Sequence, residues 1–543
     1  PMPGNLTFDA LKDAVRENRI DTVLVCLVDM QGRLMGKRFT AGHFIESAWE
    51  ETHCCNYLLA TDLEMATPDG YASTSWAKGY GDYALKPDLS TLRAVPWLEG
   101  TAMVLCDIVD HHSGEDIPQS PRAMLKAQVK RAEALGFTAM MATELEFFLF
   151  EESYRDLYRS GYRTLTPHSL YNIDYAMLGT AKEENVMRPV RNHLRAAGVP
   201  VENSKGEAEA GQEELNIRYG TALDCADHHT IAKQAIKEIA WAEGVSASFL
   251  AKWHPKRVGS AAHIHVSLWQ GDSPAFHDPE GEHGMSETMR QFCAGMIAHA
   301  DEMTALFAPY INSYKRFAKG TFAPTKIAWS VDNRTAGFRL CGEGSKAVRV
   351  ECRIGGSDMN PYLAMAAMLA AGIKGIEDKL DLEAPFKGDA YEGNVGHIPG
   401  TLRDAAETLD HLEGGEQWRT QDSSDEYDWR LIRSRLRQIR SFRRENAAGK
   451  LAHHLRQGLH WNLGNIGSPH LYGRVRVGTK QLIGDYVAEV CGALEWLCEV
   501  ETDELPLAEK LRFFRETAQS YGRSALMLSG GATLGLFHVG VVK

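Results

Sequence analysis

The spacing of apolar and polar positions predicts alternating strands and helices up to about residue 380. Residues 8–20 have the spacing of a helix, and residues 21–30 (DTVLVCLVDM) have the length and composition of a strand. Gln31-Gly32 predicts a turn into a second strand. Residues 101–109 predict another strand, and 122–135 predict a helix that ends at Gly136.

The pattern changes after residue 380. The Ala/Met-rich run 362–376 predicts a buried helix, since a span of the bilayer needs about 18 or more apolar residues. Residues 381–400 are rich in loop-forming residues, and 413–427 (EGGEQWRTQDSSDEY) are polar and acidic, which predicts a boundary. Helical, basic sequence follows to about residue 520. We divide the chain into the predicted segments 8–110, 111–410, 411–520 and 521–543, whose boundaries rest in part on the resemblances given below.

Three predicted strands carry ionisable side chains two residues apart, and such side chains share one face of a sheet. Each strand therefore directs two or three charged or imidazole groups toward the same face of the sheet. A further acidic cluster lies in KGEAEAGQEELNIRY, where Glu209 and Glu213 accompany two other glutamates. The strand pairs and the remaining glutamates are Glu144 and Glu146, His263 and His265, Arg349, Glu351 and Arg353, and Glu207 and Glu214.

Each group has a simpler structural interpretation when it is taken alone. Paired glutamates occur on solvated strand faces or loops, paired histidines occur as bonded core imidazoles, and alternating arginine and glutamate form cross-strand ion ladders. Their occurrence together indicates a divalent-cation and phosphate site, because Mg²⁺ prefers oxygen ligands and arginine binds phosphate bidentately. The sequence therefore predicts ATP chemistry without a P-loop.

Composition and charge limit the remaining possibilities. The 543-residue chain has a formal charge of −13, which argues against a general nucleic-acid binder. Its ten cysteines contain no CxxC pair. This usage predicts a reducing, cytoplasmic environment with free thiols rather than a disulfide framework or a cysteine zinc site.

Six ordered motifs over about residues 10–410 resemble the glutamine synthetase superfamily: TELEFFLF, the segment Glu207–Glu214, HIHVSLW, NSYKRF, DNRTAGFRL and VECRIGGSDMNPYLA. The resemblance implies an α+β fold, with an N-terminal β-grasp-like domain and a catalytic domain built on an antiparallel sheet. It also implies ATP-dependent ligation of glutamate to ammonia or an amine through γ-glutamyl phosphate. A ring-shaped homo-oligomer with sites between subunits, and Mg²⁺ or Mn²⁺ as cofactor, are further implications.

The resemblance assigns roles to individual positions. It implies one metal site at Glu146, Glu207 and Glu214, and a second at Glu144, His263 and Glu351. It further implies catalytic arginines at Arg316, Arg334 and Arg353, ATP contacts at His265, Ser267, Arg334 and Arg339, and substrate contacts at Gly259, Arg316, Phe322 and Arg353.

Two departures from the family pattern bear on the acceptor. The loop after Arg316 reads Gly320-Thr321-Phe322-Ala323-Pro324, so a phenylalanine stands where the family has the glutamate that deprotonates ammonium. Val258-Gly259 replaces the Asn-Gly of the glutamate-binding loop. A phenyl ring accepts no proton and binds ammonium only weakly through its π face. An organic amine, and a monoamine before a polyamine, is therefore the expected acceptor.

From about residue 405 the sequence resembles the helical N-terminal region of patatin-like lipid acyl hydrolases. The segment 521–543 resembles the start of the patatin domain, where Gly530 and Gly531 would supply an oxyanion-type turn. The nucleophile elbow G-x-S-x-G is absent from the sequence, so a lipid acyl hydrolase would lack its catalytic half. This hydrolase and a non-catalytic scaffold with a synthetase fold are the two rival functions.

Residues 430–444 (RLIRSRLRQIRSFRR) carry seven arginines and an apolar stripe at helical spacing. Two interpretations stand side by side. A basic amphipathic helix can lie weakly on an anionic membrane surface. The same helix can instead pack its apolar face on its own domain and leave the arginines in solvent.

Overall fold

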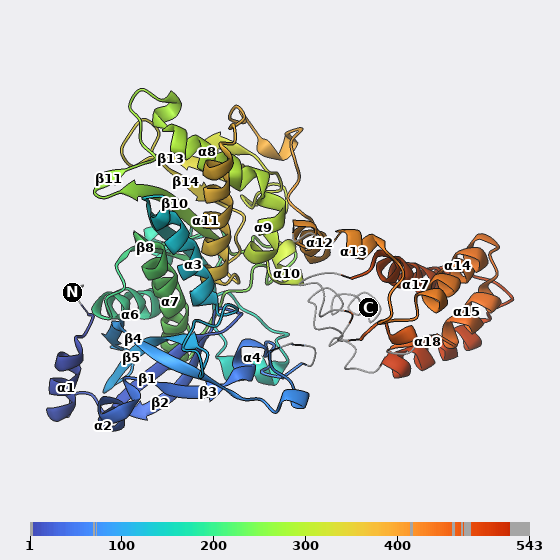
Figure 1. Ribbon diagram of the computed structural model, residues 1–543, viewed down its shortest axis with the longest axis horizontal. Coiled ribbons are helices and arrows are strands. Elements are labelled where there is room, and N and C mark those ends of the chain that lie inside the picture. Colours follow the sequence, from blue (N-terminus) through green and yellow to red (C-terminus); the bar gives the residue numbers. More distant parts are fainter. Residues whose placement is uncertain are drawn as a thin grey trace. The chain divides into compact units, whose positions relative to one another are not determined.

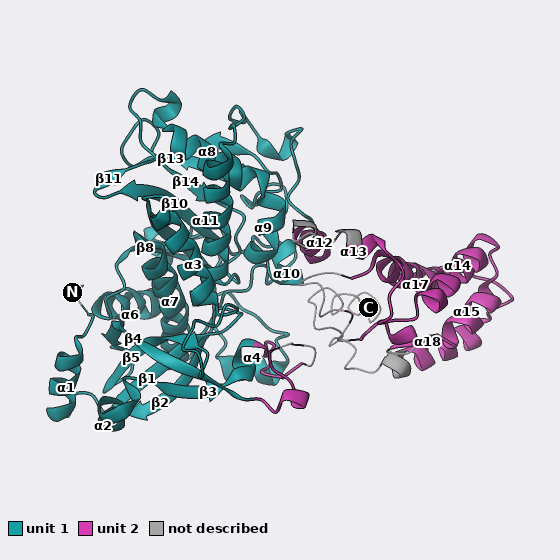
Figure 2. Ribbon diagram, viewed as in Figure 1, with its two compact units in different colours: residues 1–59, 81–401 teal, residues 60–80, 402–543 magenta. Residues whose placement is uncertain are grey.

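The computed structural model describes residues 4–68, 71, 73–412, 416–458, 462–468, 471 and 479–521. The predicted turn at Gly530 and Gly531 lies outside these residues, as does nearly all of the predicted segment 521–543. The chain divides into two compact units, residues 1–59 with 81–401 and residues 60–80 with 402–543 (Figure 2). Within the described residues, no helix is both long enough and apolar enough to cross a membrane.

The first sheet has five strands in the order β2-β1-β5-β4-β3. β1 and β5 are parallel neighbours in the middle of the sheet, and the other pairs are antiparallel. Helix α1 and the central strands enclose their own apolar core, which includes Leu11, Val23 and Val104. The strands are β1 (Thr22–Val28), β2 (Leu34–Thr40), β3 (Thr52–Cys55), β4 (Asp82–Ala94) and β5 (Thr101–Val109).

The second sheet has nine strands, seven of them in the order β12-β13-β14-β10-β6-β8-β7. β11 pairs with β10, and β9 pairs with β6. The sheet is not wholly antiparallel as predicted, because β12 and β13 run parallel. The strands are β6 (Thr138–Phe150), β7 (Val201–Gly206), β8 (Gln212–Thr221), β9 (Ser246–Ser248), β10 (Ala262–Gln270), β11 (Ser273–Pro274), β12 (Trp329–Val331), β13 (Phe338–Cys341) and β14 (Arg349–Cys352).

Long helices of the first unit pack against one another and against this sheet (Figure 1). The buried helix predicted at 362–376 is α11, which packs against α3, α7 and α8. Asn360 caps it by accepting from the Tyr362 amide, and Pro361 occupies its first turn. The longer helices are α1 (Phe8–Arg16), α3 (Pro121–Ala134), α6 (Glu184–Ala196), α7 (Ala222–Ala242), α8 (Glu287–Ala298), α9 (Ala300–Phe307) and α11 (Pro361–Asp378); the shorter ones are α2 (Ala41–His43), α4 (Tyr154–Ser160), α5 (Met177–Thr180) and α10 (Ile311–Tyr314).

A buried ionic network joins the first sheet to three helices of the same unit. Arg122 of α3 bonds Asp88 of β4, Asp107 of β5 and Asp227 of α7. Asp227 also accepts a 2.6 Å hydrogen bond from the Tyr362 hydroxyl of α11. Arg122 and Asp227 are each 2% exposed. The guanidinium therefore neutralises the buried carboxylate of Asp227, which water does not solvate, together with the partly exposed carboxylates of Asp88 and Asp107.

The second unit is helical around its own apolar core. In α14 the apolar stripe predicted at 430–444 is directed into that core, since Ile432, Leu436 and Ile439 are buried. Arg440 and Arg443 of the same helix pair with Glu489. These contacts favour the packed interpretation over the membrane-surface one, because the apolar face is already covered. The helices are α12 (Leu402–Leu412), α13 (Glu416–Thr420), α14 (Trp429–Arg444), α15 (Ala448–Arg456), α17 (Gln481–Glu499) and α18 (Leu507–Tyr521).

Candidate active site

The register of the nine-stranded sheet assembles a polar face from the predicted positions. His263 of β10 lies opposite Glu144 of β6, and His265 lies opposite Glu351 of β14. Glu146 of β6 lies opposite Glu214 of β8. Since residues two apart share a face, these pairs lie on one side of the sheet in neighbouring rows. A slip of one residue would turn all of them to the other side.

The first cluster consists of three carboxylates, Glu146, Glu207 and Glu214. One oxygen from each lies within 4.8 Å of the others. Burial, together with repulsion from neighbouring carboxylates, raises the pKa of Glu146 well above its usual range and that of Glu214 to about 8. Lys205 bonds Glu207 and brings a positive side chain to the cluster. Converging, mutually repelling oxygens fit a hard divalent cation, which would relieve the repulsion.

The other two glutamates of this acidic segment point elsewhere. Glu209 pairs with Arg257 at 2.8 Å. Glu213 is buried on the opposite face of β8, and burial followed by a hydrogen bond with Glu183 raises its pKa to about 10. The period-two alternation of a strand explains this separation from Glu214.

The second cluster combines carboxylates with imidazoles. Glu144 contacts His263 Nδ1 at 3.1 Å and His265 Nε2 at 2.9 Å. Burial opposes ionisation of Glu144, but hydrogen bonds from both histidines outweigh it and hold the pKa well below its usual range. One ligand atom from each of Glu144, His265 and Glu351 lies within 4.8 Å of the other two, and the role of His263 as the ligand beside these two glutamates stays a prediction. His263 Nδ1 remains 3.4 Å from Glu351.

Arginines flank the second cluster. Arg339 Nη1 donates to Glu351 at 3.0 Å, and Arg353 donates to the other oxygen of the same carboxylate. Burial raises the pKa of Glu351, but His263 and Arg353 outweigh it and lower that pKa to about 2. Arg316 is buried and donates to the Ile354 carbonyl. Arg334, in contrast, lies exposed in the turn after β12.

A cavity of about 470 Å³ adjoins Glu144 and His265. Tyr219 and Trp269 stack beside it, with ring centroids 6.4 Å apart and an interplanar angle of 19°. Ser267, predicted to contact ATP, lines the cavity and accepts a 3.0 Å hydrogen bond from Trp269 Nε1. Among the lining residues that the sequence reasoning did not assign to a site are Met140, Met141, Tyr219, Trp269 and Lys346. In the sequence, only their position on or beside the strands with charged residues could have indicated that they line this cavity.

The loop that carries Phe322 lies near Arg353. Phe322 is 56% exposed and has a φ of 57°, which is an unusual backbone conformation for a bulky residue. Its carbonyl accepts from Arg353 at 3.4 Å, and the next carbonyl, of Ala323, accepts from the Tyr391 hydroxyl at 3.0 Å. These two hydrogen bonds stabilise the backbone of the turn. The phenyl ring of Phe322 lies in solvent rather than in the core.

Gly259 approaches Arg316 closely. A Cβ at this position would lie 2.6 Å from Arg316 Cγ and 2.3 Å from the Ala251 carbonyl oxygen. The Gly259 carbonyl accepts a 3.0 Å bond from Gln212, whose amide also reaches Glu146 at 3.2 Å. A side chain at 259 would therefore displace Arg316 from the sheet face.

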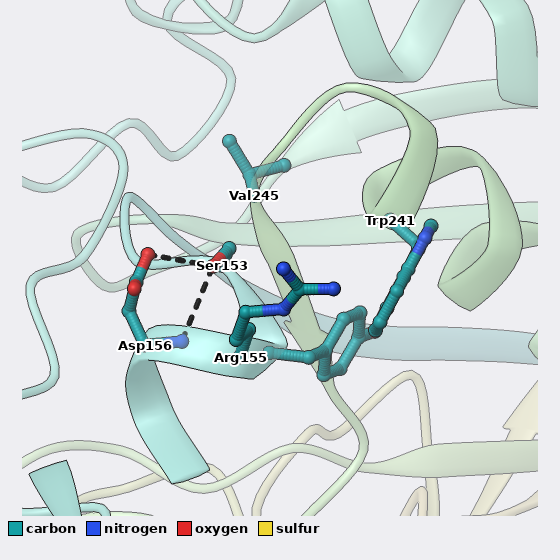
Figure 3. A pocket seen from close by; sticks show the side chains of 6 residues that line it. Ser153, Arg155, Asp156, Trp241 and Val245 are labelled. Atoms are coloured by element: carbon teal, nitrogen blue, oxygen red, sulfur yellow. Dashed lines mark hydrogen bonds between the residues drawn. The ribbon is translucent and has the colours of Figure 1, made fainter. Parts of the chain in front are cut away.

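A second hollow, of about 260 Å³, lies between α4 and α7. Figure 3 shows the Ser153–Asp156 hydrogen bonds on one side of it and the Trp241 ring on the other. The Asp156 carboxylate in this hollow already accepts a 2.6 Å hydrogen bond from the Ser153 hydroxyl. Arg155 is the one basic residue among those that line the hollow. It lacks the converging carboxylates of the polar sheet face.

The chain resembles known proteins over its first unit. Residues 118–428 match the family model "Glutamine synthetase, catalytic domain". Gamma-glutamylethanolamide synthetase GlnA4 of Streptomyces coelicolor is 46% identical over 74% of this chain and 86% of its own length. A glutamate–isopropylamine ligase of a Pseudomonas species is 39% identical over 74% and 87%. A GmaS structure in complex with ADP has a TM-score of 0.65 and 27% identity, and covers 75% of this chain and 91% of its own.

Residues 402–519 match a family model described as a domain of unknown function, DUF3336. This match covers most of the helical second unit. It carries no activity with it, so the patatin-like resemblance of this segment stays a prediction.

Proposed function

This chain belongs to the glutamine synthetase family and is an ATP-dependent ligase of glutamate and an amine, and we propose that its acceptor is an organic monoamine rather than ammonia. Phe322, in the position of the family's ammonium-deprotonating glutamate, carries this proposal. Two relatives named for ethanolamide and isopropylamine products or substrates support it.

The reaction has two steps. A γ-carboxylate oxygen of glutamate attacks the γ-phosphorus of ATP, the bond to ADP breaks, and γ-glutamyl phosphate forms. The amine nitrogen then attacks the carbonyl carbon of the γ-glutamyl phosphate, the bond from that carbon to the phosphate oxygen breaks, phosphate leaves, and the nitrogen loses a proton. Both steps depend on positioning and charge neutralisation more than on covalent help from the protein.

We propose that the cavity beside Glu144 receives ATP. The flat rings of Tyr219 and Trp269 suit a purine base, and Ser267 and His265 offer hydrogen-bonding groups on the strand that leads to the acidic clusters. Two Mg²⁺ or Mn²⁺ sites would lie beside this cavity. One would be formed by Glu146, Glu207 and Glu214. The other would be formed by Glu144, Glu351 and either His263 or His265. When bound, these ions supply charge neutralisation to the phosphates.

Arginines complete the charge balance around glutamate and the transferred phosphoryl group. Arg339 and Arg353 each bond Glu351, so both guanidinium groups are held at the edge of the second cluster. Arg316 is fixed by the Ile354 carbonyl and by the close approach of Gly259. We assign Arg316 and Arg353 to the glutamate carboxylates, Arg339 to phosphate, and Arg334, from its exposed turn, to phosphate on substrate binding.

The acceptor would meet Phe322 at the rim of this face. A phenyl ring cannot take the proton of an ammonium ion, but it provides apolar surface for an alkyl or aryl group. An exposed ring, on a loop whose carbonyls accept from Arg353 and Tyr391, therefore favours an amine that carries carbon over ammonium.

Finer structural assignments are also proposals. We assign the five-stranded sheet to the β-grasp class because its central β1–β5 pair is parallel. We propose a homo-oligomeric ring from the family resemblance and a cytoplasmic location from the cysteine usage. The second unit is assigned no chemistry. Neither the hydrolase nor the scaffold alternative is favoured over ligation.

The test of the acceptor is a panel of amines with phosphate release as the readout. Alkylamines and small hydroxyalkylamines should give kcat/KM at least about tenfold above ammonium, a difference of about 1.4 kcal/mol in transition-state binding. Phe322→Glu should raise ammonium use relative to the best amine, because a carboxylate attracts ammonium and accepts its proton. Phe322→Leu, which keeps apolar surface, is the matched control. An unchanged ammonium-to-amine ratio in Phe322→Glu would show that this residue does not select the acceptor.

A further inference from the structure

A third group of potential metal ligands lies on the first sheet, away from the polar face of the second. Glu51 and His53 lie at β3, and His111 follows β5. One ligand atom from each lies within 4.8 Å of the other two. Ligation of glutamate and an amine uses none of them.

The spacing of these atoms suits a metal ion. His53 Nε2 is 3.2 Å from His111 Nδ1 and 3.2 Å from Glu51 Oε1. In a tetrahedral site with bonds of about 2.0–2.1 Å, neighbouring ligand atoms are about 3.3–3.4 Å apart. Two of the three separations therefore already match the edges of such a site.

Hydrogen bonds alone cannot satisfy all three of these ligand atoms at the same time. If His53 Nε2 carries a proton, it can point that proton at Glu51 or at His111, but not directly at both. If it carries a lone pair, it can accept from His111 but then opposes the carboxylate oxygen. A cation at the centre uses all three lone pairs at once.

The ligand types indicate which ion would bind. Two imidazoles and one carboxylate suit Zn²⁺, Co²⁺, Ni²⁺ or Cu²⁺, whereas Mg²⁺ prefers oxygen ligands. The side chains of Glu51 and His53 are 47% and 42% exposed, so a water molecule can reach a fourth position. The site would join β3, a strand at the edge of its sheet, to the segment after the central strand β5.

We propose that Glu51, His53 and His111 form a surface site for a transition-metal ion such as Zn²⁺, with a water molecule as the fourth ligand. A bound metal ion would link the edge strand β3 to the segment after β5. It would raise the unfolding free energy of the first unit in proportion to the logarithm of the free metal concentration. The proposal is independent of the ligase reaction.

Cobalt spectroscopy on the full-length, chelator-treated protein tests it. Mg²⁺ in excess is present throughout, so that oxygen-rich clusters are occupied by a competing ion. Wild type should bind one Co²⁺ with the intense visible absorption of a four-coordinate ion, which Zn²⁺ displaces and further Mg²⁺ does not. His111→Ala should remove this absorption and weaken Co²⁺ binding at least about tenfold.

Three further variants separate this site from others. Glu51→Gln should weaken Co²⁺ binding while both imidazoles remain. Loss of binding in two variants at different positions would show that the loss does not come from a folding defect at His111 alone. His112→Ala, the exposed neighbour whose ring centroid is 5.4 Å from that of His111, should retain the absorption, as should Glu144→Gln in the second acidic cluster. Absorption that survives His111→Ala, or that disappears in Glu144→Gln, would overturn the proposal, as would a weak six-coordinate spectrum in wild type.

Discussion

The buried guanidinium of Arg122 provides a direct test of how the first sheet is joined to its helices. Arg122→Met keeps the length of the side chain and removes its charge. Asp227, 2% exposed, would lose bonds of 3.1 and 3.2 Å to the guanidinium, and Asp88 would lose one of 2.8 Å. Lys126 would still pair with Asp107. The variant therefore removes the one guanidinium that bonds the buried Asp227 carboxylate among the interactions described above.

Breaking a buried ion pair in this way costs about 3–5 kcal/mol. Unfolding entropy is about 2.1 cal/mol/K per residue, so the roughly 380 residues of the first unit correspond to about 0.8 kcal/mol/K. The expected fall in the Tm of this unit is therefore about 4–6 °C.

Differential scanning calorimetry on full-length variants measures this change. Arg131→Met on the same helix is the matched control, because its pair with Glu377 is 36% and 35% exposed and should contribute less than about 1 kcal/mol. Asp227→Asn added to Arg122→Met removes the unpaired charge and should restore at least about half of the lost Tm. The reasoning would be refuted by an Arg122→Met variant no less stable than Arg131→Met, or by a double variant with no recovery.

Three other outcomes are expected. Glu144→Gln, which removes the charge shared by two imidazoles, should lower phosphate release at least about 100-fold with an unchanged Tm; near-normal turnover would exclude a role in catalysis. Tyr391→Phe removes the 3.0 Å bond to Ala323 and should raise KM for the amine about 2- to 10-fold with little change in KM for ATP; equal rises in both would contradict a role specific to the acceptor loop. Burial, then repulsion from Arg93, lowers the pKa of His228 from 6.5 to about 3, so the unfolded chain gains a proton below pH 6.5 that the folded chain does not bind. The wild type should thus lose about 2 kcal/mol of unfolding free energy between pH 7 and pH 5 at this residue. His228→Gln should lack that loss, whereas exposed His112→Gln should retain it, in denaturant titrations at the two pH values.

Local patterns predicted much of the fold. The strand at 101–109 has the predicted ends, and the apolar run at 362–376 lies within α11. Both have strong periodicity or continuous apolar character, which depends on neighbours in sequence. The parallel β12–β13 pair was not predicted, because strand direction depends on the path of the chain between the strands.

The candidate site shows the same limit. The i, i+2 pattern correctly placed Glu144 with Glu146 and His263 with His265 on one strand face each. The approach of both histidines to Glu144 and Glu351 depends on the register of β10 with β6 and β14, which no local pattern contains. Lys205, on β7 opposite Glu214, was missed for that reason too. The metal-ligand roles themselves stay predictions.

Lys205 gives the three-carboxylate cluster a tethered counterion. Its ammonium group bonds Glu207, lies 3.3 Å from Asp174 and sits 4.3 Å from the centre of the Tyr175 ring. A monovalent ion entering the cluster would gain little that the lysine does not already provide, whereas a divalent ion brings twice the charge. Sodium and potassium, although abundant in solution, must therefore compete with an attached cation, and the cluster should bind divalent ions in preference to them.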